Sequence, residues 1–103
     1  MKKILLSSDD KMKIYLVPDA VAKNLKEYCI HFSFDWILND PNAAKYQVTT
    51  PSGEKGVMFT AQDFIDYLNT YVFPTQKSTF VAQMDFYHYE IPEEYKDDPS
   101  FNF

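Results

Sequence analysis

The pattern of apolar and polar residues at the start of the chain predicts a β-hairpin. Residues 2–7 and 12–17 are short apolar runs, and the second is rich in β-branched and aromatic side chains. The polar residues between the two runs favour a turn. We therefore expect two short antiparallel strands at this end of the chain.

A helical spacing follows the second strand. Pro18 and Asp19 favour the first turn of a helix, and the Asn- and Pro-containing residues 39–42 favour its end. This segment predicts a helix over residues 19–38. Ser33 could cap a second short helix, so a break near that residue is an alternative. The apolar stripe that carries the prediction consists of Val21, Leu25, Tyr28, Cys29, Phe32 and Trp36.

The opposite face of this helix changes from charged to apolar along its length. It begins with lysine and glutamate and continues with Ile30, Phe34, Ile37 and Leu38. A helix that is apolar on nearly all sides must be covered on both sides. Either its second half runs through the core, or Ile30, Phe34 and Ile37 form a patch for a partner protein or a homodimer.

A second hairpin is expected in the middle of the chain. Residues 46–50 and 57–60 have the composition of strands, and residues 51–56 between them contain both glycines of the chain. Glycine and proline in such a short connection favour a turn, so the two strands are expected to pair antiparallel.

The cleanest amphipathic pattern belongs to a second helix. Thr60 and Asp63 have the spacing of a capping box, in which each residue bonds the backbone N–H of the other. The apolar stripe that follows predicts a helix over residues 61–72, and Pro74 ends it.

The last part of the chain is less regular. Residues 78–89 fit both strand and helix spacing, and their β-branched and aromatic content favours a strand. Residues 92–103 are rich in acids and are expected to form a tail that is either mobile or docked through Tyr95, Phe101 and Phe103.

These elements together predict an α+β fold. The expected sheet is antiparallel, has four to five strands and carries two amphipathic helices, in the order ββαββαβ. We expect a single domain over residues 1–91, followed by the acidic aromatic C-terminal tail at residues 92–103.

Composition narrows the classes of function. The chain has 103 residues, a net charge of −5 and no arginine, which argues against nucleic-acid binding. One cysteine cannot form an internal disulfide, and no apolar run is long enough for a signal peptide or a membrane span, so we expect a cytoplasmic protein. The use of lysine in place of arginine throughout the chain is typical of an AT-rich genome, and we expect a bacterial source.

The residues that could carry catalysis or bind a metal are few. Cys29 and His31 are two residues apart, so on a helix they point in different directions and cannot share one metal ion. His31 and Asp35 could orient an imidazole for base catalysis, but no serine lies in a nucleophile elbow. We expect His88 to lie at the rim of an apolar face. The sequence predicts no catalytic residue, no cofactor and no metal ion.

An aromatic and acidic segment near the C-terminus is a candidate for docking. From Asp85 onward the chain carries six acidic residues and one lysine, interleaved with tyrosine and phenylalanine. Acidic side chains favour a basic partner, and aromatic side chains anchor it in pockets. The predicted contact residues in this segment are Tyr87, Tyr89, Glu93, Glu94 and Tyr95.

The sequence therefore predicts a small acidic protein–protein interaction module, such as an inhibitor or immunity-type protein that binds a basic partner. Two alternatives remain open. One is a self-associating structural protein that forms a homodimer through Ile30, Phe34 and Ile37. The other is a small enzyme with a site near His31 and Asp35. No binding of nucleic acid or membrane is expected.

Overall fold

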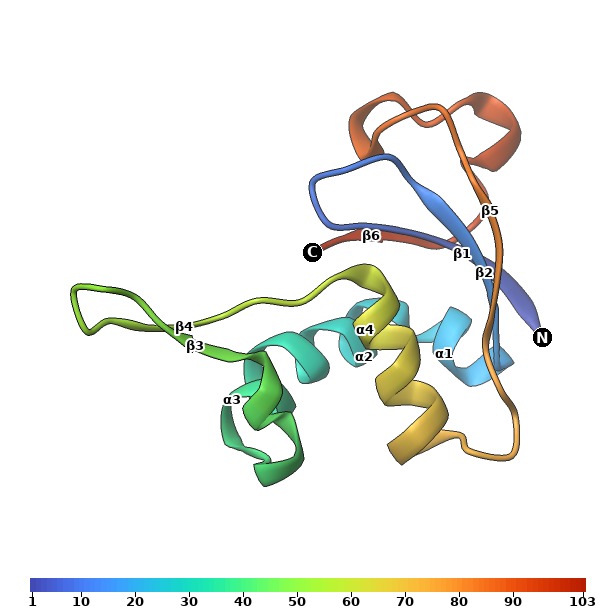
Figure 1. Cartoon of the computed structure of the whole chain (residues 1–103). Coiled ribbons are helices and arrows are strands. Elements are labelled where there is room, and N and C mark those ends of the chain that lie inside the picture. Colours follow the sequence, from blue (N-terminus) through green and yellow to red (C-terminus); the bar gives the residue numbers. More distant parts are fainter.

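The predicted N-terminal hairpin forms the centre of a four-stranded sheet. In the computed structural model, which describes all of residues 1–103, β1 (Lys2–Ser7) and β2 (Lys13–Val17) pair antiparallel as expected. β5 (Thr79–Gln83) pairs antiparallel with β2, whereas β6 (Ser100–Asn102) pairs parallel with β1. The order is β5-β2-β1-β6, so the fold is α+β as predicted but the sheet is mixed (Figure 1).

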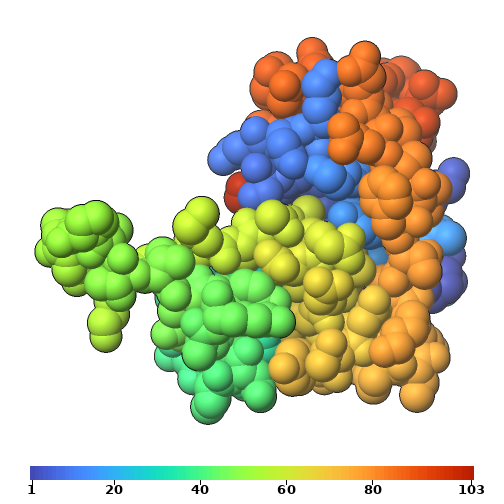
Figure 2. Space-filling model, in the orientation of Figure 1, coloured from blue at the N-terminus to red at the C-terminus, as the bar shows by residue number.

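The second predicted hairpin does not join this sheet. β3 (Gln47–Thr49) and β4 (Lys55–Val57) pair antiparallel only with each other, as a separate two-stranded unit after the 3₁₀ helix η2 (Pro41–Tyr46). Only Val48 and Val57 of these strands are half-buried, so the hairpin lacks an apolar face with which to extend the main sheet. It stands away from the body as an arm (Figure 2), and residues 47–57 are called the arm below.

Hydrogen bonds hold the tip of the arm. The Thr50 N–H donates to the Glu54 carbonyl at 2.8 Å, and the Glu54 N–H donates to the Thr50 hydroxyl at 3.1 Å. Gly53 has a φ of 87°, the left-handed conformation that glycine adopts without steric cost. These contacts close the turn at the tip of the arm.

Helical segments cover one face of the sheet (Figure 1). The first predicted helix is interrupted at Asn24, and its continuation includes a π-helical turn. None of the helices combines the length and the apolar composition that crossing a membrane requires. The segments in this part of the chain are α1 (Asp19–Lys23), α2 (Leu25–His31), η1 (Phe32–Trp36) and α3 (Ile37–Asn39).

Ser33 does not begin a new helix. Its hydroxyl donates a hydrogen bond of 2.8 Å to the Cys29 carbonyl, one turn earlier in the helix. Serine that bonds back in this way competes with the helical ladder and accompanies local distortion. The predicted break near Ser33 is thus a π-helical turn without a cap, and the actual break is at Asn24.

The predicted capping box and second long helix are confirmed. α4 (Ala61–Tyr67) continues through the π-helical turn η3 (Leu68–Val72). The Thr60 hydroxyl accepts a hydrogen bond from the Asp63 N–H at 3.3 Å, and the Asp63 carboxylate accepts one from the Thr60 N–H at 2.8 Å. Both exchanges satisfy N–H groups that the helix itself leaves unpaired.

Residues 78–89 form a strand only at their beginning. Beyond β5, the Met84 N–H still donates to the Met12 carbonyl, and the Met12 N–H donates to the Phe86 carbonyl. Met12 immediately precedes the first residue of β2. The chain beyond Phe86 therefore has no neighbouring strand with which it can pair. It crosses the second face of the sheet through η4 (His88–Glu90) and η5 (Glu93–Tyr95). On that face Leu5, Met12 and Ile14 pack against Met84, Phe86, Ile91 and Tyr95.

Residues 92–103, predicted as an acidic tail, pack on the domain and end in β6. Phe101 and Phe103 lie against the helix-covered core, and Tyr95 lies against the opposite face of the sheet. The Asn102 side chain accepts hydrogen bonds from the Ser7 hydroxyl at 2.7 Å and the Asp9 N–H at 2.9 Å. The structure thus shows the docked form of this segment.

Candidate functional site

An exposed apolar ridge runs along the outer side of α2, η1 and α3. Ile30, Phe34 and Leu38 are spaced four residues apart and are 39%, 71% and 52% exposed. Ile37, which the sequence pattern placed in this patch, is fully buried in the core. The wider π-helical turn before it shifts the following residues around the helix axis, so Ile37 joins the buried stripe.

A hollow lies between this ridge and the C-terminal strand. It has a volume of about 340 Å³, and aromatic rings form most of its wall. Phe34 contributes from the helix, Val57 and Phe59 from the base of the arm, and Phe103 from the end of the chain. Residues from three distant parts of the sequence therefore build one apolar cavity.

A second hollow, lined by both apolar and polar residues, adjoins the first along the arm. It has a volume of about 440 Å³ and lies between Leu38 and the paired strands β3 and β4. Val57 lines both hollows, and Phe34 and Leu38 are successive members of the ridge. We call this continuous surface the apolar notch, and it consists of Ile30, Phe34, Leu38, Val48, Val57, Phe59, Phe101 and Phe103.

The shape of the molecule makes the notch concave. Because the arm stands away from the body, an open corner remains between the arm and the sheet layer (Figure 2). Met58, at the base of the arm, is 71% exposed and adds a flexible apolar side chain beside the notch. A partner that enters this corner would meet apolar side chains on more than one side.

Charged residues also border the ridge. Lys26, Glu27, His31 and Asp35 line a shallow hollow of about 520 Å³ together with Ile30 and Phe34. His31 Nδ1 lies 3.1 Å from an Asp35 carboxylate oxygen, so the structure brings this predicted pair together. Both side chains are more than half exposed. An exposed pair at this spacing is common on helices and is seldom catalytic.

No nucleophile or metal site accompanies the His31–Asp35 pair. Cys29 is fully buried on the other side of the helix, and the Ser33 hydroxyl bonds to a backbone carbonyl. No group of three or more His, Cys, Asp or Glu side chains lies close enough to hold a metal ion.

The Cys29 thiol provides a test of the packing beneath the ridge. Burial raises the pKa of this thiol, so the reactive thiolate is scarce at neutral pH. We expect a thiol reagent to label the folded protein on the order of a hundredfold or more slowly than the urea-unfolded protein. The measurement is the absorbance of the released reagent over time. Equal labelling rates in both states would place Cys29 at the surface.

The predicted aromatic contacts near the C-terminus are only partly exposed. The Tyr87 and Tyr89 rings are stacked with centroids 5.6 Å apart, and Tyr89 is 73% exposed. The Lys11 ammonium lies over the Tyr87 ring at 5.2 Å. Tyr95 is half-buried and packs on Phe86. Tyr89 is therefore the main aromatic side chain that this segment offers to a partner.

Three of the six acids of this segment, Asp85, Glu90 and Glu93, have hydrogen-bond or ion-pair partners within the chain. The Lys11 ammonium hydrogen-bonds to Asp85 and holds the pKa of that carboxyl below its usual value. Glu90 accepts a hydrogen bond from the Tyr87 N–H, and Glu93 pairs with Lys96 at 2.9 Å. Asp97 and Asp98 border a hollow that Lys2, Lys3 and Lys23 also line. Glu94 is exposed and has no ion pair or side-chain hydrogen bond.

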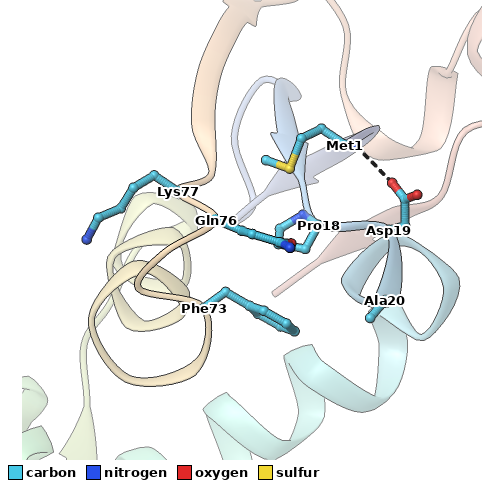
Figure 3. A pocket seen from close by; sticks show the side chains of 7 residues that line it. All are labelled: Met1, Pro18, Asp19, Ala20, Phe73, Gln76 and Lys77. Carbon is cyan, nitrogen blue, oxygen red and sulfur yellow. Dashed lines mark ion pairs between the residues drawn. The ribbon is translucent and has the colours of Figure 1, made fainter.

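The hollow with the largest volume is not a convincing ligand-binding site. Its volume is about 620 Å³, and it lies between the first residue, the start of α1 and the loop after η3 (Figure 3). The Met1 amine and the Asp19 carboxylate in its wall lie 3.0 Å apart and neutralise each other. Lys77 points away from the hollow in Figure 3 and donates to the Asn69 carbonyl. The remaining polar side chain in its wall is that of Gln76.

Sequence patterns alone identified Ile30 and Phe34 of the notch but did not assign the rest. Leu38 continues their four-residue spacing, so the ridge was visible in the sequence. Val57, Phe59 and Phe103 join it only through tertiary packing, and no local pattern indicates that. Protein-family models, curated protein sequences and solved structures were compared with this chain, and none matches it.

Proposed function

We propose that this chain is a protein–protein interaction module without enzymatic activity, and that the apolar notch is its binding surface. The observation that carries the proposal is the exposure of Phe34, a large aromatic side chain at 71%, where the ridge meets the aromatic hollow. Contiguous exposed apolar surface with a polar rim is typical of protein interfaces.

The surroundings of Phe34 favour an anchoring role. The hollow beside it has walls of Val57, Phe59 and Phe103, which form a preformed apolar pocket. Aromatic side chains and the pockets next to them supply most of the binding free energy in many interfaces.

The predicted docking of a basic partner on the C-terminal segment is the second candidate. It is supported by Tyr89 and Glu94, which are exposed, and by the stacked Tyr87 and Tyr89 rings. An inhibitor or immunity-type role would use this face through charge complementarity. This segment has one largely exposed aromatic side chain and no apolar hollow, whereas the notch combines an exposed ridge with an aromatic hollow, so the notch is the better supported surface.

A pair of matched substitutions separates the two surfaces. Phe34→Asp and Tyr89→Asp place the same carboxylate on side chains of almost equal exposure, 71% and 73%. We expect the wild-type protein from the cells that produce it to elute in a complex larger than its 12.1 kDa monomer. Phe34→Asp should shift the protein to the monomer position, because a charge in an apolar interface is costly to desolvate. Tyr89→Asp should leave the complex intact.

Two outcomes would count against this proposal. Elution of the wild-type protein as a monomer in every extract would remove its basis. A complex that survives Phe34→Asp but is lost with Tyr89→Asp would favour the C-terminal segment and a basic partner. Circular dichroism of both variants checks that neither substitution unfolds the protein.

A further inference from the structure

We infer that the notch receives an extended segment of the partner polypeptide, which pairs with β4 as a third strand of the arm. This inference rests on the proposed function and names the chemistry of the partner at the same surface. When a strand is added to a free sheet edge, main-chain hydrogen bonds give affinity and pockets for alternate side chains give specificity. The arm stands away from the body (Figure 2) and offers both features.

The outer edge of β4 has main-chain groups that face away from β3. In an antiparallel pair, residues alternate between bonding the neighbouring strand and directing their N–H and C=O groups outward. Met58 faces inward, because its N–H donates to the Tyr46 carbonyl at 2.8 Å. Lys55, Val57 and Phe59 therefore direct their main-chain groups outward. Neither the N–H nor the carbonyl of Phe59 bonds to another main-chain group.

The other free edges are less suited to a partner strand. On the opposite side of the arm, the N–H of Gln47 already donates to the Ala44 carbonyl. β5, at one edge of the main sheet, has an irregular register with β2, of the kind that protects sheet edges from further pairing. β6, at the other edge, has three residues. The edge formed by residues 55–59 is longer than β6, and the register of β4 with β3 is regular.

Alternate side chains of this edge line the aromatic hollow. Val57 and Phe59 form part of its wall, whereas Met58 between them is 71% exposed. In a paired strand, the residue directly opposite lies on the same face, with Cβ atoms about 4.5–5.5 Å apart. Partner residues opposite Val57 and Phe59 then face the hollow, whose other walls include Phe34 and Phe103. An aliphatic and an aromatic side chain suit these two positions.

A lysine indicates the charge of the partner segment at the tip end of the same edge. Lys55 is exposed, takes part in no ion pair and, by strand alternation, shares a face with Val57. Opposite charges directly across two strands are stabilising, and like charges are destabilising. An acidic residue opposite Lys55 completes the expected segment, which has acidic, aliphatic and aromatic side chains at successive alternate positions.

A pair of proline substitutions tests the role of the main chain. Val57→Pro removes an outward N–H of β4, and Thr49→Pro removes an outward N–H of β3 on the opposite edge of the same arm. Proline is tolerated at such edge positions. In the complex from the cells that produce the protein, Val57→Pro should weaken association roughly tenfold or more, because one main-chain hydrogen bond is lost. Thr49→Pro should bind as the wild-type protein does.

Amide hydrogen exchange of the wild-type complex tests the same pairing without a substitution. The N–H groups of Val57 and Phe59 should exchange at least about tenfold more slowly in the complex than in the free protein, and that of Thr49 should be unchanged. Unchanged exchange at Val57 and Phe59, in a complex that still depends on Phe34, would overturn this inference and leave the proposed function standing. A protein that forms no complex in any extract would remove the proposed function, and this inference with it.

Discussion

Replacement of Phe32 by alanine is expected to lower the free energy of unfolding by about 3–5 kcal/mol, the usual cost of removing a buried aromatic ring. Phe32 is fully buried at the centre of the main core. Its ring contacts aromatic rings from its own helical segment, from α4, from the residues that flank the arm and from the C-terminus. Those rings belong to Trp36, Tyr46, Phe59, Phe64, Tyr67 and Phe103.

The neighbouring Phe34 supplies the matched control for this prediction. It is the same residue type on the same π-helical turn but is 71% exposed, so Phe34→Ala should change stability by less than about 0.5 kcal/mol. Urea unfolding followed by tryptophan fluorescence measures both variants. Equal destabilisation by the two substitutions would mean that Phe34 is buried in the isolated chain. It would contradict the description of Phe34 as part of an exposed ridge.

Removal of residues 100–103 is expected to cost about 5 kcal/mol, which is close to the whole stability of many small domains. The deletion takes away β6, its pairing with β1 and the burial of two phenylalanine side chains. Each half-buried ring contributes about 1–2 kcal/mol, and the hydrogen bonds of Asn102 to Ser7 and Asp9 add about 1 kcal/mol each.

Ser100→Ala is the control for the truncation. Its side chain is exposed and makes no hydrogen bond, so the substitution should leave the unfolding midpoint unchanged. The truncated chain should show a lower midpoint in urea, or no cooperative transition at all. A truncated protein as stable as wild type would show that the last four residues are a dispensable tail.

Local chemistry made much of the fold predictable. The turn residues after β1 and the strand composition of β2 identified the central hairpin, and the Thr60–Asp63 spacing identified the start of α4. The helical period over residues 19–38 identified the buried stripe of the first helical segment. Each of these features depends on residues within about ten positions of one another.

The features that could not be predicted depend on distant contacts. β6 has three residues within an acid-rich segment, and it is a strand only because β1 offers a free edge. The arm has strand composition, but no rule in its sequence excludes it from the main sheet. The sequence pattern wrongly assigned Ile37 to the exposed face, because the π-helical turn at Phe32–Trp36 changes the helical period. The residues of that turn give no clear indication of a π-helix.

The candidate site was predictable to the same extent. The ridge followed from the spacing of Ile30 and Phe34, because spacing within one helix determines which side chains share a face. The aromatic hollow did not follow, because Phe59 and Phe103 meet Phe34 only after the sheet and helices have packed. Sequence patterns therefore identified the helical wall of the notch. The walls formed by the base of the arm and by the C-terminal strand are known only from the structure.

Photo-crosslinking from the ridge tests the central claim most directly. A photoreactive phenylalanine analogue replaces Phe34 in one variant and Tyr89 in another, and both are irradiated in the cells that produce the protein. We expect a discrete protein adduct from position 34 and little or none from position 89. An adduct near twice 12.1 kDa would identify a second copy, and another mass would identify a different chain. No adduct from position 34, with a strong one from position 89, would contradict the assignment of the apolar notch as the binding surface.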